Sequence, residues 1–217
     1  MTSTSACTCP QCWGLGVSGA TQCGYCGGLG TVPDVMLSEH FAFSEWCRPH
    51  VGCPNGAPGD AVTRARLSLL RVIEPGRALL AQRMGREVAL VCHSGYRCPQ
   101  LDVLADGGNT KWLTQYSAHA LGSAFDLAPA DPNAATLKQL LEAMRDAAAA
   151  GAGMDQVIAE GGCIHAAYEG PDDHGAPMPP SMGRRRGQTN ARVRDATGSG
   201  YHYEVYVGTP EQWARIV

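Results

Sequence analysis

The decapeptide SAHALGSAFD, residues 117–126, places His119 and Asp126 on either side of Gly122, with few other polar side chains around them. A zinc ion that catalyses hydrolysis keeps three protein ligands and leaves one position for water, and a mixed set of histidine and aspartate suits that arrangement. Glycine allows the chain to turn sharply. A histidine at the entrance to a strand and an aspartate within it can therefore converge on one metal ion.

The third ligand must come from another part of the chain. His165 in CIHAAY and His202 in YHYEVYV both lie on expected strands. Neutral imidazole is a common zinc ligand, so the residue types leave both histidines open.

Two copies of the pattern C-x-x-C-x-G-x-G begin at Cys9 and Cys23. Each C-x-x-C forms a tight turn that points two thiolates at one metal ion, so Cys9, Cys12, Cys23 and Cys26 are predicted to bind a structural zinc ion. A segment so poor in apolar residues needs such a metal to order itself. The repeat resembles the cysteine-rich zinc region of DnaJ-type chaperones, which implies metal binding but not chaperone function.

The elements that must position these residues are helices and strands in mixed order. Strands are expected at 87–93, 122–129, 155–160, 163–169 and 201–207. Helices are expected at 61–84 with an interruption at Pro75, at 98–105, at 133–151 with Asn133 as the cap and Gly151 as the stop, and at 209–217. Residues 170–200 are expected to form a long loop. This order predicts an α+β fold with a mainly antiparallel sheet flanked by helices, preceded by a small zinc module over 1–32.

The composition argues against a nucleic-acid-binding protein and against a membrane protein. The formal net charge of −3 gives no overall attraction to nucleic acid, and 44% hydrophobic content fits a globular chain. No apolar run approaches the roughly 20 residues that span a bilayer, and the N-terminus lacks the layout of a secretory signal. We therefore expect no membrane insertion, no nucleic-acid partner and a chain that is cytoplasmic when made.

Three blocks together resemble a known family. SGYRCPQLD (94–102), SAHALGSAFD and DQVIAEGGCIHAAY (155–168) are similar, in order and spacing, to the zinc D-alanyl-D-alanine carboxypeptidases, which share their fold with the Hedgehog signalling domain. The similarity runs from about Phe41 to Tyr168. It implies that residues 33–217 form a zinc peptidase domain of the Hedgehog/DD-peptidase type.

The resemblance also implies a set of site residues. It makes His119, Asp126 and His165 the ligands of the catalytic zinc ion, and so prefers His165 over His202. Arg97 would hold a substrate oxygen or carboxylate near the metal, a role suited to its rigid charged fork. Ser117 would support the ligand histidine or contact substrate, and Tyr96, in the same motif as Arg97, is a further substrate-binding candidate.

The general base departs from the family pattern. Several members carry the catalytic acid three residues before the last histidine, where this chain has Gly162. The nearest carboxylate is Glu160, which a hairpin could bring to the attacking water. Glu204, beside His202, is the second candidate.

The function implied is zinc-dependent hydrolysis of amide bonds in peptidoglycan stem peptides, by a carboxypeptidase or an endopeptidase. Zinc lowers the pKa of water toward about 7, a glutamate removes the proton, and zinc with Arg97 stabilises the oxyanion. The expected cofactors are one catalytic and one structural zinc ion.

The cell wall lies outside the cytoplasm and we expect no secretory signal, so a phage origin is attractive. The enzyme would then be released by lysis, or it would be a virion tail component that docks on other tail proteins. The alternative is a non-catalytic zinc-binding docking protein of a phage tail tip, supported by Gly162.

The remaining cysteines and basic residues have simpler interpretations. Cys47, His50 and Cys53 could contribute to another metal site or a redox pair, although buried free thiols are more common. Small core residues are expected at Cys92, Cys98 and Cys163. The segment 183–194 is expected to be a solvated basic loop.

Overall fold

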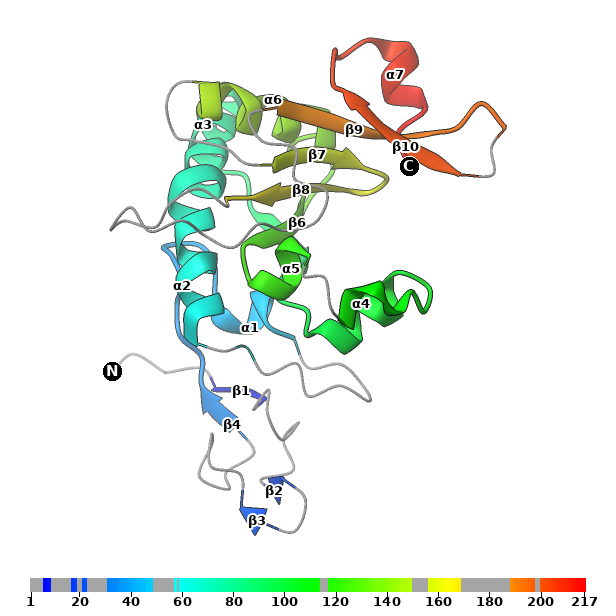
Figure 1. The fold of residues 1–217 in the computed structure, drawn as a ribbon. Helices are drawn as coiled ribbons and strands as arrows, with labels where there is room; N and C mark the ends of the chain where they lie inside the picture. The colour runs from blue at the N-terminus through cyan, green and yellow to red at the C-terminus, as the bar shows by residue number, and fades with distance from the viewer. Residues whose placement is uncertain are drawn as a thin grey trace.

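The central feature of the fold is a six-stranded mixed sheet with helices packed against one of its faces (Figure 1). The computed structural model describes residues 6–8, 17–18, 21–22, 31–48, 57, 59–113, 117–149, 156–168, 188–197 and 200–217. The protein is therefore of the α+β class, as the sequence predicts.

The sheet has the strand order β10-β9-β7-β8-β6-β5. Its strands are β5 (Leu90–Ser94), β6 (Ala124–Pro129), β7 (Gln156–Glu160), β8 (Cys163–Ala167), β9 (Gln188–Arg194) and β10 (Tyr201–Val205). All neighbours are antiparallel except β7 and β9, which are parallel. The expectation of a mainly antiparallel sheet is thus confirmed, with one parallel pair added.

The two faces of the sheet differ in chemistry because side chains alternate along each strand. On one face, Phe125, Leu127, Ile164, Val157 and Ala159 are fully buried in the main hydrophobic core. Their sequence neighbours Asp126, His165, Ile158 and Glu160 lie on the opposite face and line a cavity. One set of strands therefore supplies both the core and the polar surface of the candidate site.

Three helical segments run almost without interruption along the core. They are α2 (Gly59–Ser68), the π-helical segment η1 (Leu69–Ile73) and α3 (Glu74–Met84). Pro75 is the second residue of α3, but Ile73 before it is also helical, so the chain stays helical through the proline. The expected interruption is a change to the π-helical segment η1 just before it. A left-handed Gly85 ends α3.

Helix α6 (Leu137–Ala147) packs against α3. Its first residue differs from the start that the sequence predicts. The expected cap, Asn133, lies outside the helix. Thr136 is the cap instead, because its hydroxyl accepts from the Gln139 N–H while the Gln139 side chain accepts from the Thr136 N–H. This reciprocal pair satisfies two backbone donors that Asn133 is too far away to reach. The expected stop, Gly151, is outside the described residues.

Strand β9 is the main error of the sequence-based prediction, which placed residues 170–200 in a loop. Within QTNARVR, Ala191 and Val193 are buried and face the core, whereas Arg192 lies on the cavity face. The strand is polar because only one of its faces packs on apolar residues. The expected basic loop at 183–194 is therefore a strand from Gln188 onward.

Strand β5 also differs from its prediction as a buried strand over 87–93. It starts at Leu90, forms one edge of the sheet, and buries only the side chain of Cys92. An edge strand has one paired neighbour, so less of it is covered.

The remaining described elements are short. They are α1 (Phe43–Trp46), α4 (Pro99–Ala105), η2 (Thr110–Leu113), α5 (Ala118–Leu121) and α7 (Pro210–Ala214). None of the helices in the described ranges has the length and apolarity required to traverse a lipid bilayer.

The N-terminal segment contributes two antiparallel strand pairs, at the bottom of Figure 1. Its strands are β1 (Ala6–Thr8), β2 (Val17–Ser18), β3 (Thr21–Gln22) and β4 (Thr31–Pro33), paired as β1 with β4 and β2 with β3. The four predicted zinc ligands, Cys9, Cys12, Cys23 and Cys26, lie outside the described residues.

Glu74, in the first turn of α3, ties this helix to the preceding segment. Its carboxylate accepts hydrogen bonds from the Ser38 hydroxyl at 2.6 Å and from Arg77 Nε at 3.2 Å, and lies 3.0 Å from His40 Nδ1. Burial raises the pKa of Glu74, but these hydrogen bonds and the His40 charge outweigh it and lower the pKa below its ordinary 4.5.

Replacing Glu74 with Gln should therefore lower the free energy of unfolding at pH 7 by about 1 kcal/mol. A lowered folded-state pKa gives stability that is complete above pH 5 and is lost as the pH falls through that pKa. Urea unfolding at a series of pH values from 7 to 3 measures the effect, with Glu39→Gln in the same segment as an exposed control. A Glu74→Gln deficit of equal size at pH 7 and pH 3 would contradict this origin.

Candidate metal centre

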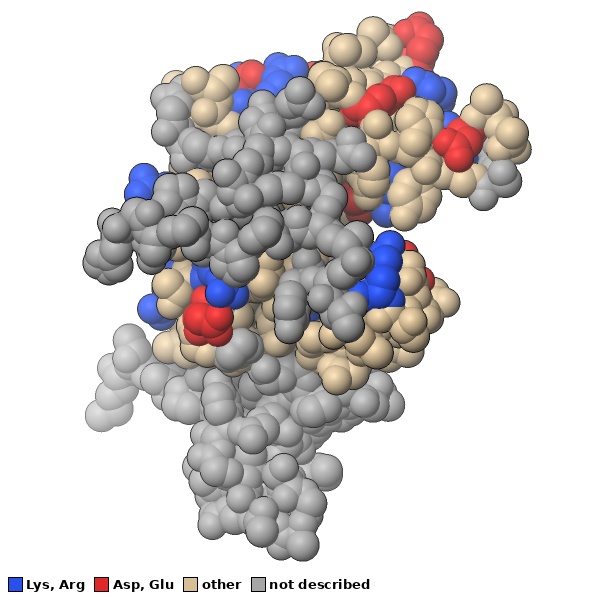
Figure 2. All heavy atoms as spheres, in the orientation of Figure 1, with Lys and Arg blue, Asp and Glu red and all other residues tan. Residues whose placement is uncertain are grey.

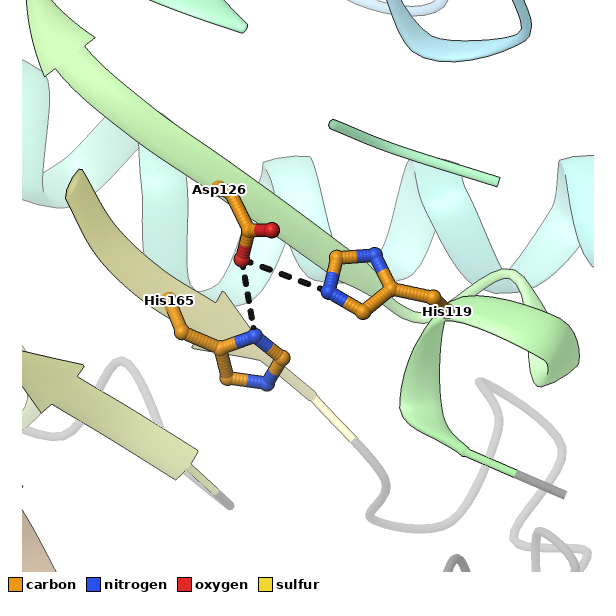
Figure 3. Close-up of side chains that lie close together, drawn as sticks. All are labelled: His119, Asp126 and His165. Atoms are coloured by element: carbon orange, nitrogen blue, oxygen red, sulfur yellow. Dashed lines mark hydrogen bonds and ion pairs between the residues drawn. The ribbon is translucent and has the colours of Figure 1, made fainter. Parts of the chain in front are cut away.

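His119, Asp126 and His165 converge at one point on the cavity face of the sheet (Figure 3). Asp126 Oδ1 lies 3.3 Å from His119 Nε2 and 2.9 Å from His165 Nδ1. One ligand atom from each residue lies within 4.8 Å of the other two. All three residues are largely buried, and together they could hold a metal ion.

Local sequence explains how the two histidines reach the aspartate. Asp126 on β6 pairs directly with His165 on β8, so their side chains emerge side by side on one face. His119 lies on α5, immediately before β6 in the chain. Ser117 caps α5 by accepting from the Ala120 N–H at 3.0 Å.

Gly122 provides the turn from α5 into β6 that the sequence predicts. Its φ of 86° is in the left-handed region, which favours glycine, and it ends the helix by donating to the His119 carbonyl. A Cβ at this position would also lie 2.6 Å from Ala61 on α2. Close packing and the turn therefore both require the absence of a side chain here.

The outer nitrogens of the two imidazoles fix which nitrogens face Asp126. His119 Nδ1 lies 2.6 Å from the Gly95 carbonyl oxygen, which can only accept, so Nδ1 carries the proton. His165 Nε2 lies 3.2 Å from Gln156 Oε1 and donates to it in the same way. In the neutral rings, a lone pair on His119 Nε2 and another on His165 Nδ1 then point at the Asp126 carboxylate.

With neutral rings, three acceptors face one another in a buried place, which is unfavourable unless a metal ion or a proton on His165 lies between them. Ligand histidines in proteins have this arrangement, with one nitrogen on the metal and the other donating to a carbonyl or amide oxygen. Two imidazoles and one carboxylate also match the ligand types of catalytic zinc. The residues present thus fit a divalent metal ion.

The surrounding charges and burial favour the ionised carboxylate of Asp126 and the neutral imidazole of His119, the forms that bind metal ions. Burial raises the pKa of Asp126, but the charges and hydrogen bonds of the two histidines outweigh it and hold the pKa well below its usual range. Burial lowers the pKa of His119, and the Arg97 charge lowers it further against the opposing effect of Asp126. Asp126 is therefore ionised and His119 neutral at pH 7, as metal binding requires.

His165 behaves differently from His119. Burial alone would lower its pKa, but the hydrogen bond and charge of Asp126, together with the charge of Glu160, raise it. A proton therefore competes with a metal ion more strongly at His165 than at His119.

The cluster opens into a cavity of about 360 Å³ between α4 and the strands β7, β9 and β10. Figure 2 shows the surface indented between the β9–β10 region and the α4 region, with charged side chains on both sides. Besides the cluster, the polar and aromatic lining residues are Arg97, Asp102, Asp106, Lys111, Ser117, Gln156, Glu160, Arg192, Tyr201 and Tyr203. A ligand in this cavity can thus reach both a metal ion and charged groups.

Of the other predicted site residues, Arg97, Ser117 and Glu160 line the cavity. Arg97 forms an ion pair with Asp102 on α4, with 2.8 Å between Nε and Oδ1. Glu160, at the end of β7, pairs with Arg192 at 3.3 Å between Oε2 and Nη1. The turn that follows Glu160 uses Gly162 at a φ of 112°, in the left-handed region that favours glycine.

Tyr96 lies apart from this cavity. It is 6% exposed, its ring packs 5.6 Å from that of Trp46, and burial raises its pKa to about 12. It lines a second cavity, which shares Arg97 with the first. The structure therefore places Tyr96 in the core rather than beside the metal centre.

His202 and Glu204, the alternative ligand and alternative base, lie outside the metal cluster. His202 is exposed and pairs with Asp195 at 2.7 Å. Glu204 pairs with Arg215 at 2.7 Å and accepts from Gln212 Nε2 at 2.9 Å. Of the two candidate histidines, the one that the structure brings to Asp126 is His165.

The cysteines partly follow expectation. Cys92 is buried with a free thiol and Cys163 is half-buried with a free thiol. Cys98 is half-buried and packs against the main core as predicted, but it is disulfide-bonded rather than free. Cys47 is buried and free, whereas His50 and Cys53 lie outside the described residues.

Sequence reasoning missed several cavity residues, chiefly Asp102, Gln156, Arg192 and Tyr203. Gln156 shares a strand face with Glu160, and alternation could have indicated it. Arg192 was missed because β9 was taken for a loop, although Ala191 and Val193 carry the alternating signal of a half-buried strand.

No protein-family model, curated protein or solved structure gives a significant match to the chain. What the site can do is therefore argued from its own geometry. A buried site with two neutral imidazole nitrogens and a carboxylate, open to a cavity with two arginines and a glutamate, can bind a metal ion and a polar substrate beside it.

The first test of the site is metal stoichiometry. We expect native mass spectrometry to find two zinc ions in the protein, one at the predicted N-terminal cysteines and one at this cluster. His165→Ala should lose one ion because it removes one of three ligands. The matched control His202→Ala should keep both, and loss of zinc in that variant or its retention in His165→Ala would refute the assignment.

Proposed function

We propose that this protein is a zinc-dependent hydrolase of amide bonds in peptidoglycan stem peptides. The observation that carries the proposal is the convergence of His119, Asp126 and His165 at the base of a cavity that also presents Arg97 and Glu160. Each of these residues comes from one of the three blocks that resemble the zinc D-alanyl-D-alanine carboxypeptidases. The same resemblance supports a Hedgehog/DD-peptidase fold for 33–217, and the two C-x-x-C-x-G-x-G repeats support a structural zinc site in the N-terminal segment.

Zinc is the metal we favour. Two imidazoles and one carboxylate are a ligand set of hydrolytic zinc enzymes, whereas magnesium and calcium prefer oxygen ligands. Zinc in such a site polarises a carbonyl group and lowers the pKa of water toward about 7.

Glu160 is the proposed general base. It lies on the same strand face as Gln156, which contacts His165, and its charge is near enough to raise the pKa of His165. Its carboxylate would accept the proton of the attacking water and later deliver it to the leaving amine. Arg192 holds this carboxylate from the neighbouring strand and itself donates from Nε to the Val217 carbonyl at 2.8 Å.

Arg97 is the proposed substrate-binding cation. Its side chain is 23% exposed and lines the cavity beside His119. A guanidinium binds a carboxylate or a developing oxyanion through two parallel N–H groups. Stem peptides carry free carboxylates, so a site with a fixed guanidinium next to a metal ion suits them.

The second candidate is a non-catalytic zinc-binding docking protein of a phage tail tip. The observation that favours it is Gly162, a turn residue at the position where several family members carry their acid. In that case the metal ion would hold the cavity walls in place for a partner protein. For either function, we propose that the protein is released by lysis or is assembled into a virion, where other tail proteins are its partners.

Incubation with purified peptidoglycan, followed by mass analysis of the fragments, tests the proposal. We expect the wild-type protein to release stem-peptide fragments, to lose activity with a chelator and to regain it with zinc. Glu160→Gln should lower kcat by about 10²-fold to 10⁴-fold, the usual contribution of a general base, while zinc stays bound. The fragment masses identify the bond that is cleaved.

Glu204→Gln is the matched control, since it removes a carboxylate that is bound to Arg215 and Gln212 outside the cluster. It should keep wild-type kcat. Unchanged activity in His119→Ala would refute metal-dependent hydrolysis. Full zinc occupancy without release of any fragment would favour the docking protein.

A further inference from the structure

A single buried carboxylate connects the two halves of the site. We propose that Asp102 is a positioning residue that fixes Arg97 and the helix carrying His119 relative to each other. The part of this inference that concerns substrate rests on the proposed function, whereas the part that concerns the metal ligand does not.

Both oxygens of Asp102 are in use. The residue lies on α4, and its side chain is 3% exposed. Oδ1 pairs with Arg97 Nε at 2.8 Å, and Oδ2 accepts a hydrogen bond from the Ser117 hydroxyl. One carboxylate therefore contacts both Arg97, which lines the cavity, and Ser117, which lies on the same helical turn as the metal ligand His119.

The bond to Ser117 acts on the orientation of α5. The Ser117 hydroxyl donates its proton to Asp102, and its oxygen accepts from the Ala120 N–H, so the hydroxyl is fixed from both sides. The Ser117 carbonyl accepts from the Leu121 N–H at 3.0 Å. His119 lies within this single turn, so a shift of Ser117 would move the imidazole relative to Asp126.

The ion pair with Arg97 joins Asp102 to a residue of the cavity wall. Arg97 Nε lies beside Asp102, and Arg97 also lines the cavity. The Arg97 main chain is also joined to α5, because its N–H donates to the His119 carbonyl at 3.4 Å. Arg97 and His119 are thus linked once through the backbone and once through Asp102.

Packing alone does not explain a carboxylate at this position. A buried carboxylate carries a large desolvation cost, and replacing a buried ion pair by apolar residues of similar size is often neutral or stabilising. A carboxylate provides both a negative charge to pair with the guanidinium and an acceptor oxygen for the hydroxyl.

Asp102→Asn tests the inference, because the amide keeps the shape but loses the charge and one acceptor. The matched control is Asp146→Asn on α6, which breaks ion pairs with Arg83 and Arg145 away from the cavity. Cobalt(II) is the probe of the metal centre, because its visible absorption reports the ligand geometry. Its affinity is measured by competition with a chelator, alongside kcat and KM on stem peptides.

We expect Asp102→Asn to weaken cobalt binding about tenfold or more, as loss of a group that orients a metal ligand usually does, and to change the absorption spectrum. KM should rise about tenfold with a smaller change in kcat, since one charge-assisted contact that positions Arg97 is lost. Asp146→Asn should match the wild-type protein in all three readouts. Wild-type cobalt affinity and spectrum in Asp102→Asn would overturn the positioning role.

Two further outcomes are separable. If the wild-type protein binds cobalt but hydrolyses no stem peptide, the proposed function fails and the cobalt readouts alone decide the role of Asp102. If Asp102→Asn does not fold, Ser117→Gly removes the link from Asp102 to α5, and glycine is tolerated at an N-cap almost as well as serine. A tenfold weaker cobalt site in that variant supports the inference, and an unchanged one overturns it.

Discussion

The structure depends on one electrostatic arrangement: a buried carboxylate with the lone pairs of two imidazoles directed at it. The outer nitrogens of His119 and His165 donate to the Gly95 carbonyl and to Gln156, so in the neutral rings the inner nitrogens are free to bind a cation. Three acceptors held this close, away from water, are unfavourable until a cation joins them. The fold keeps them together because they lie on a helix turn and two paired strands whose opposite faces form the hydrophobic core.

The two-faced sheet explains how a small domain combines a stable core with a charged cavity. Along β6, Phe125 and Leu127 are fully buried on the core side, and Asp126 between them is on the cavity side. A slip of one residue in the pairing of β6 with β8 would exchange these faces and bury the charges in the core. The register that positions the metal ligands is therefore the register that the hydrophobic core enforces.

The walls of the cavity come from parts of the chain that are far apart in sequence. Arg97 is held on one wall by Asp102, and Glu160 is held on the other by Arg192. Each wall thus combines a cation with an anion, which keeps the charged groups oriented without leaving a buried charge unpaired. This organisation gives the metal centre two polar groups of opposite sign within reach of one ligand.

The sequence by itself determined the elements whose signals are local. The spacing of His119, Gly122 and Asp126 indicated a turn between two ligands, and the glycine pair after Glu160 indicated a hairpin, because both depend on neighbouring residues and on glycine's backbone freedom. Alternation along β6, β7 and β8 was equally readable. Asn133 is not the cap of α6 because Thr136 with Gln139 three residues later forms a capping box, a local pattern that could have distinguished the two candidates.

Tertiary structure alone decided the rest. The residue types left His165 and His202 equally open and the family resemblance favoured His165; the pairing of β8 with β6 is what brings His165 to Asp126. Arg192 lies in the site because β9 pairs in parallel with β7. This pairing is a long-range contact, and the sequence of a polar strand does not indicate which strand it will pair with. Asp102 met Ser117 and Arg97 through the packing of α4 against α5. Local sequence sets the conformation of a segment, whereas the burial of apolar faces between distant segments decides which polar side chains meet.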